Sequence, residues 1–125
     1  MISRLFAAAL AVGFAVTPLL AHHSFAAQYD AQKQVTLKGV VTKVEWTNPH
    51  IYVHIVVTTE GKTVNWALEG FPPNSLTRIG WTRNLVKEGD TISVLGALAK
   101  DGTNLANMRE VTLSDGRKLA AGGAQ

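Results

Sequence analysis

Hydrophobic and polar residues alternate in the middle of the chain with a period of two, which is typical of β-strands buried on one face. One run covers residues 50–57, and its apolar members are Ile51, Val53, Ile55 and Val57. A second run covers residues 64–68, where they are Val64, Trp66 and Leu68. Glu60-Gly61 favours a two-residue turn between the runs. Pairing Thr59 with Lys62 then places both apolar sets on one face of a hairpin, so the pattern predicts the register as well as the strands.

An earlier strand is expected over residues 35–46, and its alternation changes along its length. The apolar positions have one parity at Val35, Leu37 and Val41 and the other parity at Val44 and Trp46. A change of parity around a glycine, here Gly39, is typical of a bulged and strongly bent strand.

The segment after the hairpin predicts a short helix. Phe71-Pro72-Pro73 ends the second hairpin strand, because proline cannot continue a sheet ladder. Asn74 or Ser75 is expected to cap a helix that continues to Ile79, with Gly80 as its C-terminal stop. Two further strands are expected over residues 91–99 and about 105–113.

Five strands with a helix between the third and the fourth predict a mainly β fold. In outline they match a small five-stranded antiparallel OB-like Greek-key barrel. The expected organisation is a signal peptide (1–21), an N-terminal arm (22–34), a single β-barrel domain (35–119) and a disordered tail (120–125).

The N-terminus has the features of a secretory signal peptide. Arg4 precedes an apolar run from Leu5 to Val16, and Ala21 offers a small residue for cleavage. The run is shorter than the roughly 20 apolar residues that a membrane-spanning helix needs, so no stable span is expected after cleavage. We therefore expect a periplasmic or secreted bacterial protein with His22 as its first residue.

Composition narrows the classes of function. The chain has no cysteine, which excludes disulfides and thiolate metal sites and leaves the hydrophobic core to hold an exported domain together. The formal net charge is +3, and the basic residues are interleaved with acidic ones. A nucleic-acid-binding surface should show a basic stripe, so no nucleic-acid partner is expected.

Several sequence blocks carry a family resemblance: HHSFAAQYD, VEWTNPHIYVHI, NWALEGFPPNSL, RIGWTR and VTLSDGRKL. With them the chain resembles small exported bacterial proteins catalogued as domain of unknown function 6152, over essentially the whole region after the signal peptide. The resemblance implies export and a small β domain, without an established activity. The block that starts at His22 resembles the usual start of the mature part, which supports cleavage after Ala21. Asn48-Pro49-His50 resembles a family feature without an assigned role, whereas nothing is carried over to His54.

The mature N-terminus predicts a metal site. A free α-amine and an adjacent imidazole can chelate an ion, and two histidines without a competing thiolate favour Cu(II). Cleavage before Ala21 would give Ala-His-His, which is another arrangement that binds Cu(II) or Ni(II), whereas cleavage after Ala26 would remove both His22 and His23. The alternative is that the histidines stay solvated and bind metal only adventitiously.

His50 and His54 are a second pair of histidines, four residues apart on one predicted strand. Their Cα atoms would lie about 13 Å apart, which is too far for both to hold one ion at nitrogen distances near about 2.1 Å. The predicted register places Tyr52 opposite Glu69, with the two histidines on its diagonals. Glu69 and one histidine could form a site or an imidazole–carboxylate hydrogen bond. The alternative is a solvated sheet face.

The N-terminal arm could also fold back onto this face, with Phe25 and Tyr29 packed on the sheet as anchors. His22 or His23 would then meet His50. The candidate metal ligands are therefore His22, His23 and His50, with copper as the possible cofactor.

No catalytic residues are predicted, because Ser24 beside His23 has no acid placed to orient a triad. We therefore do not expect an enzyme.

Two hypotheses of different class remain for the function of the protein. The first is a protein-interaction or structural module with a partner in the cell envelope, and the second is a copper-binding module. Trp81 is expected to plug one end of the barrel and would stack on a ligand if it were exposed. The candidate ligand or partner surface comprises Tyr52, His54, Glu69 and Trp81.

Overall fold

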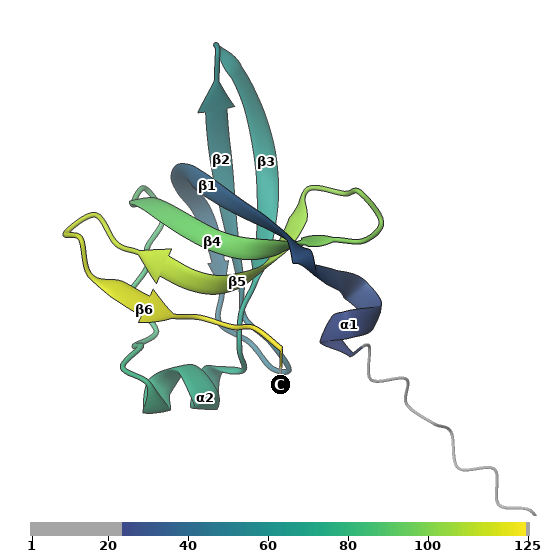
Figure 1. Ribbon diagram of the computed structural model, residues 1–125. Coiled ribbons are helices and arrows are strands. Elements are labelled where there is room, and N and C mark those ends of the chain that lie inside the picture. Colours follow the sequence, from purple (N-terminus) through teal and green to yellow (C-terminus); the bar gives the residue numbers. More distant parts are fainter. Residues whose placement is uncertain (1–23, 125) are drawn as a thin grey trace, which may run out of the picture.

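One mainly antiparallel sheet of six strands makes up most of the chain, in the order β3-β2-β1-β4-β5-β6 (Figure 1). The computed structural model describes residues 24–124. The strands are β1 (Tyr29–Glu45), β2 (Tyr52–Thr59), β3 (Lys62–Glu69), β4 (Thr91–Ala99), β5 (Leu105–Thr112) and β6 (Lys118–Ala120). The helices are α1 (Phe25–Gln28) and α2 (Pro73–Arg78). The prediction of a mainly β fold is confirmed, but the number of strands is six in place of the predicted five.

The β2–β3 hairpin has the predicted register. Thr59 pairs with Lys62 and Ile55 pairs with Trp66. Glu60 and Gly61 have φ values of 52° and 76°, which suit a two-residue hairpin turn because both φ angles are positive. Away from the turn, the apolar set of this hairpin lies in the core, where Val53, Ile55 and Leu68 are buried, whereas Val64 is 39% exposed.

The first strand is longer than predicted and begins inside the expected N-terminal arm. Tyr29 pairs with Ala99 of β4, so residues 29–34 belong to the sheet. Polar residues fill most of this stretch, which hides the alternation on which the prediction depends. The predicted change of parity is present, because the β1–β2 register shifts between Val41 and Lys43. The bulge therefore lies at Thr42, three residues after Gly39.

Helix α2 starts at Pro73, which precedes both predicted N-cap residues, Asn74 and Ser75. Its N-cap is Pro72, and no side chain makes a capping hydrogen bond. A proline at the first position replaces side-chain capping here, because its fixed φ suits the helix and it has no N–H to satisfy. Gly80, with a φ of 104°, ends the helix as predicted.

The C-terminal residues differ from the predicted disordered tail. After the turn that follows β5, Lys118–Ala120 pair with β5 as β6. Ala121 is buried, its N–H donates to the carbonyl of Arg109 at 3.0 Å, and its carbonyl accepts from Phe71 at 2.8 Å. A three-residue strand is too short to show a period in the sequence, so the alternation of residues does not predict it.

The sheet has one further pairing, which joins β3 at one end of the order to β5 near the other end. β3 pairs with β5 in parallel, over Ala67–Glu69 and Leu105–Asn107. This contact places the C-terminal end of β3 beside the start of β5.

Within residues 24–124, no helix is long and apolar enough to cross a membrane.

Candidate functional site

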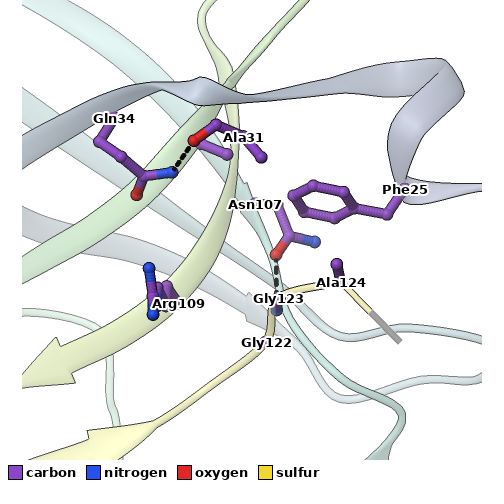
Figure 2. A pocket seen from close by; sticks show the side chains of 9 residues that line it. Phe25, Ala31, Gln34, Asn107, Arg109, Gly122, Gly123 and Ala124 are labelled. Carbon is purple, nitrogen blue, oxygen red and sulfur yellow. Dashed lines mark hydrogen bonds between the residues drawn. The ribbon is translucent and has the colours of Figure 1, made fainter.

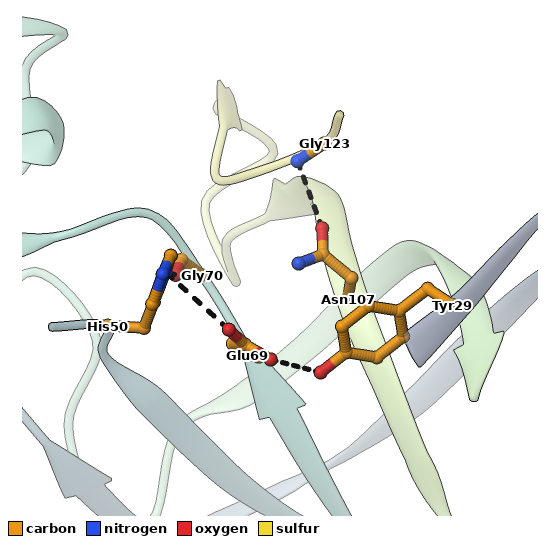
Figure 3. Close-up of polar contacts among 6 residues, drawn as sticks. All are labelled: Tyr29, His50, Glu69, Gly70, Asn107 and Gly123. Carbon is orange, nitrogen blue, oxygen red and sulfur yellow. Dashed lines mark hydrogen bonds and ion pairs between the residues drawn. The ribbon is translucent and has the colours of Figure 1, made fainter. Parts of the chain in front are cut away.

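A cavity of about 220 Å³ lies where the ends of β1, β3 and β5 meet the C-terminal segment. Its lining includes Ser24, Tyr29, His50, Glu69, Asn107 and Gly123. Figure 3 shows Tyr29, His50, Glu69 and Asn107 converging from separate parts of the chain, with the backbone of Gly123 beside Asn107. The parallel β3–β5 pairing sets Glu69 beside Asn107, so the topology of the sheet assembles this site.

Glu69 is the buried acid of the cavity, with 7% of its surface exposed. The Tyr29 hydroxyl donates a hydrogen bond to its Oε2 atom, and Tyr52 is its cross-strand partner, as predicted. A solvated sheet face was the alternative for this position, and it is wrong at Glu69. Tyr29 and β5 cover the carboxylate, and a buried charge needs such partners because desolvation is costly.

Burial and the neighbouring carboxylate of Glu69 both raise the pKa values of the two tyrosines, Tyr29 and Tyr52. Burial raises the pKa of Tyr29 far above its usual value, and the hydrogen bond to Glu69 and its charge raise it further. The pKa of Tyr52 is raised for the same reasons, burial first and the charge of Glu69 second. Tyr29 therefore stays a hydrogen-bond donor to Glu69 throughout the physiological pH range.

This coupling predicts a pH dependence of stability. An unfolded tyrosine ionises near pH ~10, whereas folded Tyr29 keeps its proton, so the unfolded state binds fewer protons above that pH. The stability that Tyr29 contributes is therefore complete below pH ~10 and declines as the pH rises, by up to about 1.4 kcal/mol per pH unit. Urea unfolding of the native protein and of Tyr29→Phe at about pH 8 and about pH 11 measures it. Tyr29→Phe should lose less stability over this interval, and equal losses in the two proteins would contradict the assignment.

His50 is oriented by the carbonyl of Gly70 and by Glu69. Its Nδ1 atom lies 2.9 Å from the Gly70 oxygen and 3.5 Å from Oε1 of Glu69. A carbonyl can only accept a hydrogen bond, so Nδ1 carries the proton and Nε2 keeps its lone pair when the ring is neutral. Nε2 has no hydrogen-bond partner among residues 24–124, and the side chain is 40% exposed. The sequence predicts that Glu69 and one histidine form either a site or an imidazole–carboxylate hydrogen bond. The structure has an imidazole–carboxylate contact, and the histidine is His50.

His54 belongs to a different polar group. Its Nε2 atom lies 2.9 Å from Oε2 of Glu45, and Lys43 lies 3.2 Å from the other oxygen of that carboxylate. The hydrogen bonds from His54 and Lys43 lower the pKa of Glu45 below its usual value. His50 and His54 therefore have separate partners. They do not share a strand as predicted, because β2 starts at Tyr52 and His50 lies in the segment before it.

Trp81 lies in the core and offers no exposed surface to a ligand or partner. Its side chain is 2% exposed, and the ring stacks on Trp46 with centroids 6.4 Å apart. The indole N–H donates to the carbonyl of Ala120 at 2.9 Å. Trp81 thus closes the core between α2 and β6, so its inclusion in the candidate surface is wrong.

His22 and His23 lie outside the described residues. Ser24 follows them directly, and it lines the same cavity as His50 and Glu69. Ser24 also caps α1, since its Oγ accepts from the N–H of Ala27 at 3.3 Å. In the stretch 24–124, no three His, Asp or Glu side chains form a group that could hold a metal ion.

Two residues of the cavity, Tyr29 and Asn107, are not among the site residues that the sequence predicts. Tyr29 was expected only as a packing anchor, and nothing in the sequence indicated its bond to Glu69. Asn107 lies in an apolar stretch between Ala106 and Met108, yet it is buried and accepts from the N–H of Gly123 at 2.9 Å. A polar residue inside an apolar strand was the available signal, because buried polar groups need partners.

The fold and the site together define a small, mainly antiparallel β protein in which buried Tyr29 and Glu69 form a group with the partly exposed His50. The chain belongs to the family of unknown function DUF6152, which matches it over residues 10–108. No curated protein matches the sequence.

Proposed function

We propose that the protein is an exported, non-catalytic module that binds a transition metal ion, copper by ligand type, between His50 and the mature N-terminus. The observation that carries this proposal is the position of Ser24, which lines one cavity with His50 and Glu69. Cleavage after Ala21 would leave only His22 and His23 before it. The proposed ligands are the α-amine, these two histidines and Nε2 of His50.

The environment of His50 supports this role. Metal-binding histidines usually donate their other ring N–H to a carbonyl or carboxylate, which fixes the tautomer and the ring orientation. His50 has such partners in Gly70 and Glu69, and its Nε2 atom is left for a ligand. Both carboxylate oxygens of Glu69 already have partners, Oε2 with Tyr29 and Oε1 with His50. We therefore propose that Glu69 orients His50 and does not coordinate the metal itself.

The length of chain before Ser24 also supports the proposed metal site. A residue of extended chain spans at most about 3.6 Å, so two residues reach about 7 Å beyond Ser24. That length suits a cavity whose wall contains Ser24. Nitrogen ligands without thiolates suit Cu(II), and a free amine next to an imidazole favours it further.

A copper titration tests the proposal on protein purified from the periplasm, with its N-terminus established by mass spectrometry. We expect stoichiometric Cu(II) binding, and a loss of affinity on the order of tenfold or more in His50→Ala. A variant with one extra residue before His22 should lose a similar amount, because the α-amine is displaced. His54→Ala is the matched control, since His54 faces Glu45, and it should bind as the native protein does.

Equal affinity in all four proteins would refute the metal site. Weakening by the extra residue alone would assign copper to an isolated N-terminal chelate and would refute the part proposed for His50. Electron paramagnetic resonance of the copper complexes of the native protein and His50→Ala distinguishes the two sets of nitrogen ligands.

We also propose that the sheet is an OB-like barrel. The parallel β3–β5 pairing supports this, because it links the strands in the circuit β1-β2-β3-β5-β4 and back to β1. β6 would then be an addition at the edge of β5.

A second candidate function is a protein-interaction or structural module of the cell envelope. The observation that favours it is the projecting end of the β2–β3 hairpin (Figure 1). Over residues 62–66, β3 pairs with β2 alone among the described strands, and Val64 is 39% exposed. A free strand edge can add a strand from a partner. The metal content of protein isolated from its native compartment separates the candidates, since stoichiometric copper favours the first and its absence favours the second.

A further inference from the structure

A second cavity of about 350 Å³ lies beside the one that contains Glu69, and Phe25, Asn107 and Gly123 line both. Figure 2 shows the Phe25 ring over Asn107, with Arg109 at the other end of the cavity. Its volume lies in the range of small-molecule sites, which begins at about 300 Å³. His50, the one proposed metal ligand within residues 24–124, does not line this second cavity.

Two irregularities of the sheet build this cavity. The β1–β4 register jumps between Asp30 and Gln34, so residues 31–33 bulge out of β1. The β4–β5 register shifts where Met108 and Glu110 pair with successive residues of β4, which leaves Arg109 as the extra residue of a bulge in β5. Bulges redirect side chains and are common next to functional sites.

The chemistry of the lining favours an anion. Within residues 24–124, Arg109 is the only charged side chain that lines the cavity, and it forms no ion pair with a described residue. Asn107 uses its Oδ1 to accept from Gly123, so its NH₂ group remains as a donor. The Gln34 amide is held in place by its bond to the carbonyl of Ala31, at 2.8 Å. A guanidinium is the side chain best suited to bind a carboxylate through two parallel hydrogen bonds.

From this arrangement we propose that the cavity binds a small organic carboxylate with a flat apolar group. Arg109 pairs with the carboxylate, Asn107 is a second donor to it, and the ring of Phe25 packs against the flat group. This site is distinct from the metal site, because its polar groups, on Arg109 and Asn107, are not among the proposed metal ligands.

Benzoate is the probe for this proposal, with backbone amide resonances of the isotopically labelled full-length mature protein as the readout. We expect saturable shifts at Gly122 and Gly123 and a dissociation constant on the order of 1 mM. Arg109→Gln and Phe25→Ala should each weaken binding by about tenfold. Arg109→Lys should retain part of the affinity, and Arg83→Gln, an exposed arginine outside this cavity, should change nothing.

Neutral benzamide is the matched control ligand, since it has the ring without the charge. Equal binding of benzamide and benzoate would overturn the proposal. Undiminished benzoate binding to Arg109→Gln, or no saturable shift at up to about 10 mM benzoate, would overturn it too. Each variant keeps the dispersed spectrum of the native protein if it is folded, so loss of the fold is distinguished from loss of the site.

Discussion

Trp81→Ala is expected to lower the free energy of unfolding by about 4 kcal/mol, the largest effect of any single substitution proposed for this protein. The Trp81 ring is 2% exposed, so alanine would leave a large cavity that the neighbouring side chains cannot fill completely. It would also remove the stacking partner of Trp46 and leave the carbonyl of Ala120 without its indole donor.

Chemical denaturation measures this loss, and two variants divide it into its parts. Trp81→Phe keeps most of the apolar volume but removes the N–H, so it should cost about 2 kcal/mol. Trp46→Ala removes the other ring of the pair, which is only partly buried, and should cost less than Trp81→Ala. If Trp81→Ala were as stable as Trp46→Ala, the burial of Trp81 would not be the main source of its contribution.

Gly39→Ala is expected to lower the free energy of unfolding by about 3 kcal/mol, because the new methyl group has no space. A Cβ atom at Gly39 would lie 2.5 Å from the carbonyl oxygen of Val56 and 3.3 Å from Cδ1 of Ile55. The first of these is backbone in the neighbouring strand, so β1 and β2 would have to separate. The glycine thus permits a close approach of the two strands just before the bulge at Thr42.

Gly61→Asn is the control for the Gly39 variant. Apart from its chain neighbours, no atom of residues 24–124 lies within 4 Å of a Cβ atom built at Gly61, and asparagine tolerates the positive φ of that turn position. We expect a change within about 0.5 kcal/mol. Equal stability of the Gly39 and Gly61 variants, measured by urea unfolding, would refute the steric argument.

The local parts of the fold could be predicted from the sequence, because each depends on neighbouring residues. The register of the β2–β3 hairpin follows from two alternating runs and a two-residue turn, and it is confirmed at every pair. The strand over residues 91–99 is confirmed with its predicted ends. By contrast, residues 29–34 and 118–120 show no usable period, and long-range pairing with β4 and β5 makes them strands.

The candidate site could be predicted only in part, for the same reason. The hairpin register placed Tyr52 opposite Glu69, and this is confirmed. The burial of Glu69 depends on Tyr29 and on the parallel pairing with β5, which bring together segments far apart in the sequence. No local pattern carries that information. The roles of His22 and His23 remain predictions, since both lie outside the described residues.

The parallel pairing of β3 with β5 has a consequence for incomplete chains, which lack the later residues. It joins residues 67–69 to residues 105–107, and a contact between such distant segments forms only after a large loop has closed. A chain truncated before residue 105 would keep the whole β2–β3 hairpin but would lack this partner. The edge of β3 would then be open along its full length, and an open strand edge is a template for aggregation. We therefore expect early-terminated chains of this protein to accumulate as aggregates rather than as soluble fragments.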